Sequence, residues 1–204
     1  HVTVKNITDG DTLTMALQNG DIDAAYGLPY ASRNLFADNA SYNVSQTSTS
    51  RVYECAFNFH KPVMQDPNVR KAICMSLDSQ EFVDTLLDGY GEPAVGPFPS
   101  NFPFAVDASD ATSYDPDAAK QLLADDGYTD SDGDGYLDKD GQPLEITWLT
   151  YPSRQELPKL AEYAQAKLKD VGVKVDVNST ANHKNFVKSD DFDVYASAIV
   201  SAPQ

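Results

Sequence analysis

The chain has 204 residues, of which 41% are hydrophobic and 23% are charged, a balance that is ordinary for one large or two small globular domains. Its formal charge of −16 should repel phosphate backbones and anionic lipid, which argues against binding to nucleic acid. No apolar run approaches the ~18 residues that a membrane-spanning helix requires. The acidity alone indicates nothing about a substrate.

The first 50 residues alternate short apolar runs with turn signals. Residues 2–7 and 22–26 have β-prone apolar positions and are each predicted to form a strand. Between them, a helix capped by Asp9 or Asp11 is expected to end at Gly20. A short helix should then open at Pro29 and include Leu35 and Phe36, and the polar run 39–50 contains one weak strand.

Residues 51–78 predict a strand, a turn and a helix. The strand covers 52–57, and the turn follows at 58–61. Asp66 is placed to cap the next helix, because Pro67 fits the first helical position, where a missing N–H costs nothing. Apolar residues then recur at helical spacing: Val69, Ala72, Ile73 and Leu77.

A second helix and a long loop come next. Asp78, with Glu81 three residues later, predicts a capping box for a helix over 80–87 that Gly89 closes. Residues 89–113 show no periodicity and contain four prolines and exposed aromatics. We expect this loop to wrap the core, because its aromatic side chains need a surface to bury against.

The rest of the chain predicts an α/β fold, a mixed sheet flanked by helices. Asp115-Pro116 should start a helix that ends at Gly127. Strands over 144–148, 173–177 and 192–198 alternate with helices over 157–168 and near 186–187. Ligands of such sheets favour the loops beyond the strand ends, and this rule selects Ser197, Ser201 and Gln204 as candidate ligand-binding residues.

One local motif has chemistry of its own, at residues 130–138. Its potential ligands follow the order of a calcium loop: Asp130, Asp132, Asp134, the carbonyl of Tyr136, and Asp138. The twelfth position, normally a bidentate glutamate, is Gly141, so the coordination sphere would be short unless Asp140 or water completes it, and the affinity should be reduced. The alternative is an acidic surface turn in which the Asp-Gly pairs serve only the backbone geometry.

Catalysis finds little support in the sequence. The three histidines are scattered, and no nucleophile elbow, zinc-protease motif or phosphate-binding glycine loop is present. His60 is expected to be exposed or bonded to backbone. Cys55 and Cys74 are too few for a disulfide scaffold, so buried free thiols are expected, against one disulfide between strand and helix.

Several segments, in order, resemble the peptide/nickel solute-binding proteins of bacterial ABC importers. The first is DTLTMALQNGDIDAAY, and the second joins FNFHKP, DPNVRKAI and SLD. The later ones are YDPDAAKQLLADDGY, DGQPLEITWL and DFDVYASAIVSAP. The resemblance covers nearly the whole chain.

The resemblance implies a type II periplasmic-binding-protein lobe. Residues 1–48 would be the end of the first lobe, and 49–204 a C-terminally truncated second lobe. It further implies a protein outside the cytoplasm, either periplasmic or a lipoprotein at the cell surface. This protein would be a monomer, would catalyse no reaction and would need no cofactor. Its two lobes would close on a ligand and dock on membrane permease subunits.

The ligand implied is a short peptide or a nickel chelate. GDIDAAYG at 20–27 is similar to the nickel-binding members, but Ile199, Val200 and Ser201 stand where those carry aromatic residues. This favours peptide slightly. A hypothesis from another class is a calcium-binding structural or adhesive module of a cell-surface protein, based on residues 130–138.

Overall fold

A computed structural model describes residues 1–47, 49–100, 102–105 and 112–200. The first part of the chain forms α1 (Gly10–Gln18), the 3₁₀ helix η1 (Tyr30–Ser32), α2 (Asn34–Ala37), β1 (Arg51–Phe57), α3 (Pro62–Gln65), α4 (Pro67–Met75) and α5 (Ser79–Leu86). The second part forms α6 (Pro116–Asp125), β2 (Asp138–Lys139), β3 (Gln142–Pro143), β4 (Glu145–Thr150), α7 (Glu156–Asp170), β5 (Lys174–Ser179), α8 (His183–Lys188) and β6 (Val194–Val200).

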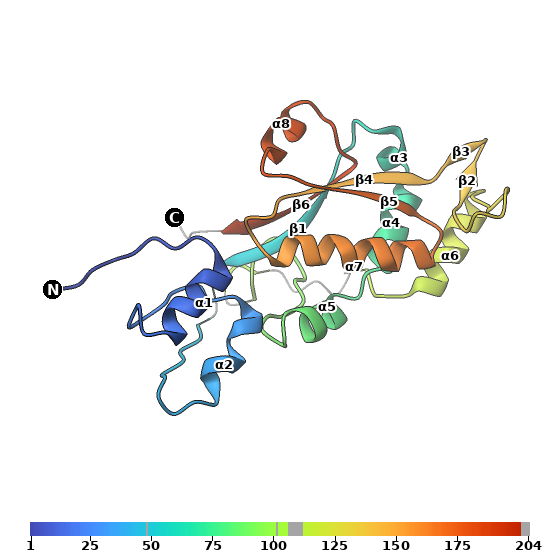
Figure 1. Cartoon of the computed structure of the whole chain (residues 1–204). Helices are drawn as coiled ribbons and strands as arrows, with labels where there is room; N and C mark the ends of the chain where they lie inside the picture. Colours follow the sequence, from blue (N-terminus) through green and yellow to red (C-terminus); the bar gives the residue numbers. More distant parts are fainter. Residues whose placement is uncertain (48, 101, 106–111, 201–204) are drawn as a thin grey trace.

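The main sheet has the strand order β1-β6-β4-β5. β4 runs parallel to β5 and β6, whereas β1 runs antiparallel to β6, so the sheet is mixed as the sequence predicted. The helices α7 and α8 are the crossovers of the parallel strands and lie on opposite faces of the sheet (Figure 1). The α/β fold class is therefore confirmed.

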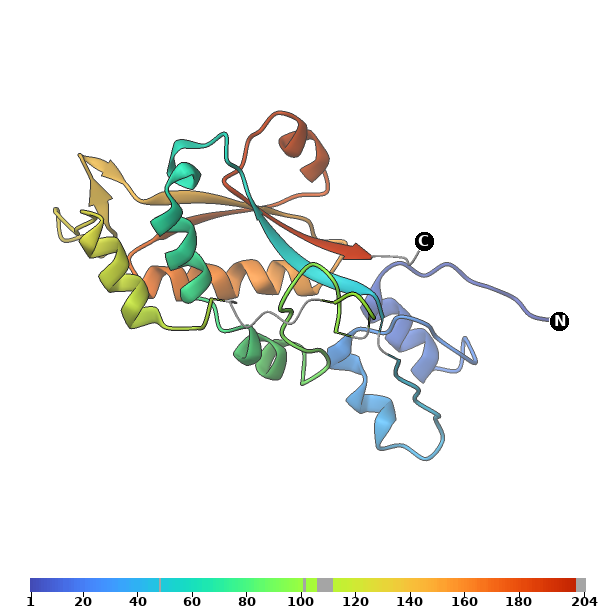
Figure 2. The same cartoon turned by 180° about the vertical axis from the view of Figure 1, so that it is seen from behind.

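The core lies between one face of the sheet and the helices α4, α6 and α7 (Figure 2). One stripe of α7 is fully buried, with Leu157, Ala161, Ala164 and Leu168 at helical spacing. Trp148 of β4 is fully buried in the same core. The burial of this stripe stabilises the pairing of β4 with β5, because α7 connects these two strands.

Aspartates begin four of the helices as predicted. The carboxylates of Asp9, Asp66, Asp78 and Asp115 each accept a backbone N–H from the first turn of α1, α4, α5 and α6. The capping box at Asp78 is only half formed. Glu81 accepts hydrogen bonds from Tyr163 and Lys167 of α7 and does not return to the backbone of Asp78.

The two predicted strands near the N-terminus are wrong for this structure. Residues 2–7 and 22–26 form neither helix nor strand, and Val2, Val4 and Tyr26 are at least 90% exposed. The weak strand expected within 39–50 is also absent from its described residues. Alternating side chains predict a strand only where a partner strand and a covering layer exist, and the described residues supply neither.

The long loop packs differently from the prediction. Phe98, Phe102 and Phe104 contact one another, with ring centroids 5.0 to 6.4 Å apart, and Phe98 and Phe104 remain over a third exposed. Part of the loop lies outside the described residues.

Cys55 and Cys74 are free thiols as expected, although Cys74 is exposed. Burial raises the pKa of Cys55 to about 12.

Candidate functional site

The carboxyl ends of β4, β5 and β6 meet at one end of the sheet, which we call the carboxyl end. The amino end of β1 lies there too, because Arg51 pairs with Val200 at the end of the antiparallel β6. Open α/β sheets bind ligands at this end. α1 lies at the same end (Figure 1), where Gly10 approaches Pro29 and Gln155, the residue before α7.

An aromatic stack covers part of the carboxyl end on the α8 face. Tyr151 follows β4, and its ring stacks on His183 at the start of α8 with centroids 4.2 Å apart. His183 also stacks on Tyr195 of β6 at 5.8 Å, and its Nδ1 shares a 2.8 Å hydrogen bond with the Tyr195 hydroxyl. The Tyr151 hydroxyl accepts the backbone N–H of Ala198 at 3.1 Å. These bonds fix the three rings in one surface.

The electrostatics of the stack favour a neutral histidine. Burial, followed by the charge of Lys184, lowers the pKa of His183 below its ordinary value of 6.5. The imidazole is therefore uncharged near neutral pH, and its Nδ1 is already bonded to Tyr195. The stack can bind a planar or apolar group by contact, and only Nε2 could serve as a metal ligand without breaking that bond.

On the opposite face, Tyr53 of β1 reaches the first residue of α7. Its hydroxyl donates to Oε2 of Glu156 at 3.2 Å. Burial, followed by the Glu156 carboxylate, raises the pKa of Tyr53, so this phenol stays protonated. The pair links β1 to the start of α7 and holds a carboxylate at the carboxyl end.

Ser197, one of the three residues predicted to contact ligand, is only 9% exposed within β6, where it pairs with Glu54. Its role as a ligand contact stays a prediction. Ser201 and Gln204 lie outside the described residues. The sequence reasoning missed Tyr151 and His183, although they lie three and six residues after the ends of the predicted strands 144–148 and 173–177.

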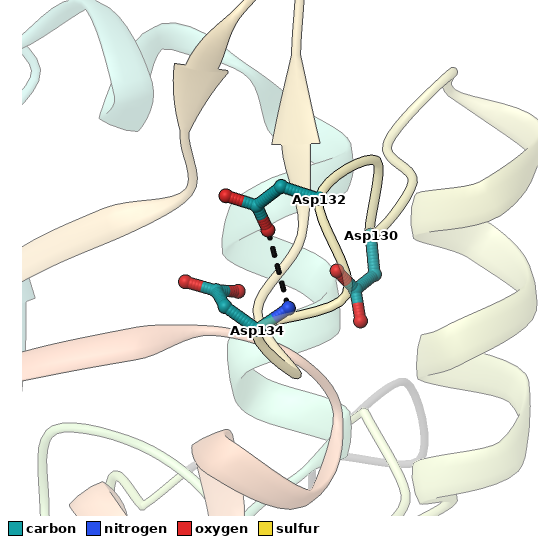
Figure 3. A group of neighbouring side chains, drawn as sticks. All are labelled: Asp130, Asp132 and Asp134. Carbon is teal, nitrogen blue, oxygen red and sulfur yellow. Dashed lines mark hydrogen bonds between the residues drawn. The ribbon is translucent and has the colours of Figure 1, made fainter.

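The acidic loop brings together three of its predicted ligands. Carboxylate oxygens of Asp130, Asp132 and Asp134 lie within 4.8 Å of one another, and all three residues are exposed (Figure 3). Asp130 also accepts the backbone N–H groups of Gly133 at 2.7 Å and Gly135 at 3.0 Å. Such an oxygen cluster suits a hard cation such as Ca²⁺.

The other two predicted ligands differ. Asp138, at the start of β2, directs its carboxylate to Ser131, accepting the backbone N–H at 3.0 Å and the hydroxyl at 2.8 Å. It therefore lies outside the three-carboxylate group. The backbone N–H of Tyr136 donates to Asp134, and the ligand role of the Tyr136 carbonyl stays a prediction. Within the described part of the chain, this is the one group of at least three potential metal-binding side chains.

Two surface hollows lie away from the carboxyl end. One, of about 310 Å³, is lined by Tyr128, Leu137 and Gly172, and the other, of about 430 Å³, by Tyr136, Gln165 and Lys174. Neither contains a residue of the aromatic stack.

The whole chain, residues 1–204, matches the family described as bacterial extracellular solute-binding proteins, family 5, middle part. The chain belongs to this family. No helix in the described ranges is long and apolar enough to cross a membrane.

Two curated relatives differ in the ligand that their names give. The oligopeptide-binding protein AppA of Bacillus subtilis is 33% identical over 180 residues, which cover 85% of this chain and 32% of AppA. The nickel-binding periplasmic protein of Escherichia coli is 30% identical over 179 residues, covering 85% of this chain and 34% of that protein. The chain thus spans about a third of the length of these relatives.

Solved structures share the fold. NikA from Brucella suis, in complex with Fe(III)-EDTA, superposes with a TM-score of 0.88 at 28% identity, covering 98% of this chain and 41% of NikA. Bacillus subtilis AppA, in complex with a nonapeptide, superposes with a TM-score of 0.81 at 26% identity, covering 97% of this chain and 41% of AppA. The type II peptide/nickel-binding lobe is therefore the fold of this chain.

Proposed function

We propose that the protein containing this chain is the solute-binding component of an ABC importer, which captures a small ligand between two lobes and delivers it to membrane permease subunits. The observation that carries this proposal is the carboxyl end of the sheet. Aromatic side chains line it, and residues 1–47 lie on the same side (Figure 1). The family of the chain supports the same function.

The proposal also assigns residues to the two lobes and places the protein outside the cytoplasm. Residues 1–48 are the end of the first lobe, and 49–204 belong to the second. The closed form must make ligand contacts that the open form lacks, since only differential binding shifts the equilibrium between them. The protein acts outside the cytoplasm as a monomer and catalyses no reaction. A lipid anchor would keep it near its permease.

The ligand class is a short peptide or a nickel chelate, with peptide preferred. The chain has Ile199 and Val200 at the end of β6, where the resembled nickel proteins carry aromatics, and the Nδ1 of His183 is bonded to Tyr195. Ser197, Ser201 and Gln204 are proposed to contribute to this site.

Native mass spectrometry of the full-length protein, purified from its source, tests the function. A ladder of bound masses matching short peptides is the expected result. A single mass equal to nickel with histidine or another small chelator would reverse the preference for peptide. A protein that arrives without any bound solute and binds neither class on titration would contradict the transport function.

We also propose calcium at residues 130–138, with Asp130, Asp132 and Asp134 as the carboxylate ligands. Three exposed carboxylates so close together repel one another, and a divalent cation would relieve that repulsion. Calcium titration should show one site that the double variant Asp130→Asn/Asp132→Asn loses. The charge-matched control Asp11→Asn/Asp23→Asn, which removes two exposed carboxylates from residues 1–47, should keep it. Equal binding by both variants would reject this assignment.

A further inference from the structure

Residues 1–47 are joined to the rest of the chain by few apolar contacts. The two hydrophobic clusters among the described residues take their buried members from residues 64–196, and Tyr30 is the one described residue of 1–47 that packs against either. It lies against the smaller cluster, which contains Phe82 and Val83 of α5. A shared core would hold the two parts of the chain as one body, whereas two bodies joined by a small contact can move apart.

Tyr90 makes the main contact with this first segment. Its ring stacks on that of Tyr30, with centroids 6.1 Å apart and an interplanar angle of 10°. The guanidinium of Arg33 lies 4.4 Å from the centroid of the same ring and donates to the Tyr90 hydroxyl. Tyr30 and Arg33 reach one ring together because they are three residues apart at a 3₁₀ turn, where such side chains share a face.

A tight turn fixes Tyr90 to the end of α5. Leu87, the residue after this helix, is 5% exposed, and its carbonyl accepts the Tyr90 N–H at 2.8 Å. Between them, Asp88 and Gly89 have φ values of +50° and +75°, and the left-handed conformation is unusual for an aspartate. The turn directs the Tyr90 ring towards residues 1–47, which supply both the aromatic and the cationic partner that the described structure gives it.

The contact is favourable but incomplete. A cation over an aromatic ring is attracted to it, and the hydrogen bond to the Tyr90 hydroxyl adds to that attraction. The Nε of Arg33, however, is buried and has no hydrogen-bond partner among the described residues. A buried donor without an acceptor costs free energy, and water would remove that cost once the two segments separate. The net gain is therefore small, as a contact that breaks and re-forms requires.

We propose that Tyr30, Arg33 and Tyr90 form a latch between the two lobes, which stabilises the closed form of the protein. The inference rests on the proposed function, in which residues 1–48 belong to the first lobe and the two lobes close on a ligand. The latch acts without contact to the ligand. It raises the affinity because the apparent dissociation constant falls as the fraction of closed, binding-competent protein rises.

The test is calorimetric titration of the full-length protein with tetraalanine and with nickel plus L-histidine. The variants are Arg33→Gln, Tyr90→Ala and their combination. The control is Tyr128→Ala, which removes another ring that lies under a cation, because the Nζ of Lys139 is 4.9 Å from its centroid. Tyr128 and Lys139 both belong to the second lobe, so this contact does not join the lobes. Thermal unfolding of each variant checks that it folds.

Each single latch variant should weaken the binding of the probe by about 5- to 30-fold, the range for a cation–π contact with a hydrogen bond. The double variant should lose no more affinity than Tyr90→Ala alone, because both changes remove the same contact. Tyr128→Ala should lower the thermal midpoint and keep the affinity of the unmodified protein.

Unchanged affinity in the folded Arg33→Gln and Tyr90→Ala variants would overturn the latch and leave the transport function standing. The latch would also be overturned if the double variant lost the product of the two single factors, or if Tyr128→Ala weakened binding as much as Tyr90→Ala. If neither probe binds to the unmodified protein, the proposed function fails for both ligand classes and the latch falls with it.

Discussion

Replacement of Gly172 by alanine should disrupt the end of the sheet opposite to the carboxyl end. Gly172 follows α7 with a φ of +84°, and an added Cβ would lie 2.6 Å from Cγ and 3.2 Å from Cδ1 of Leu137. The two residues are also joined by backbone, because the N–H of Leu137 donates to the carbonyl of Gly172 at 2.7 Å. This bond holds the two backbones together, so the clash can be relieved only if the Leu137 side chain changes rotamer or the bond is disturbed.

The cost has two parts, and a second glycine separates them. Gly89 follows α5 with a φ of +75°, and nothing lies within 4 Å of its added Cβ. Gly89→Ala should therefore cost only the left-handed backbone strain, about 1–2 kcal/mol. Gly172→Ala should cost the same strain plus about 1–3 kcal/mol for overpacking against Leu137.

Urea unfolding of the 204-residue chain measures both costs. Trp148 is its only tryptophan and is fully buried, so its emission reports the loss of the core. The double variant Gly172→Ala/Leu137→Ala should be more stable than the sum of the single effects, because the clash disappears with the leucine side chain. Equal costs for Gly172→Ala and Gly89→Ala would refute the steric reasoning.

Two further predictions concern helix ends and pH. Asp115→Ala should lower the free energy of unfolding by about 1 kcal/mol, because α6 loses the carboxylate that accepts the N–H of Ala118 at 2.9 Å, whereas Asp115→Asn should be nearly neutral. Equal losses in urea unfolding would exclude a capping role. A hydrogen bond from Lys167, and a weaker effect of one from Tyr163, hold the pKa of Glu81 below its ordinary value of 4.5. Its stabilising contribution should therefore be complete above pH 4.5 and decline as the pH falls through the lower folded pKa. Glu81→Gln should remove that decline from a series of unfolding midpoints, and an unchanged acid limb would contradict it.

The elements that the sequence predicted well are those with local causes. The proline after Asp66 and the proline after Asp115 fix where α4 and α6 begin, whatever packs around them. Glycine after α7 fixes where that helix ends, because a φ of +84° is left-handed. Such signals act over four or five residues, so one sequence suffices to detect them.

Predictions failed where the cause lies elsewhere in the chain. The alternation of Val2 and Val4 is real, yet a strand also needs a neighbour that the described residues lack. Glu81 has the spacing of a capping box, but Lys167 and Tyr163 on α7 attract its carboxylate more strongly than a backbone N–H does. Spacing within a segment contains no information about such distant partners.

The candidate site shows the same division. The rule that ligands bind beyond strand ends selected Ser197, Ser201 and Gln204, all in β6 or after it, and no residue after β4 or β5. Tyr151 and His183 follow two other strands, and only the strand order brings them together.

We expect the two ends of the sheet to have different roles, and removal of calcium tests this expectation. Residues 130–138 end at the first residue of β2 and contain Leu137, which contacts Gly172. The loop therefore lies at the end of the sheet remote from the carboxyl end (Figure 1). Calcium removal with EGTA should lower the thermal midpoint of the full-length protein and leave its affinity for tetraalanine or nickel with L-histidine unchanged. Asp130→Asn/Asp132→Asn should show the lower midpoint without chelator. A change in affinity that accompanies calcium loss would mean that the ends are coupled through β4, and the loop would then regulate binding.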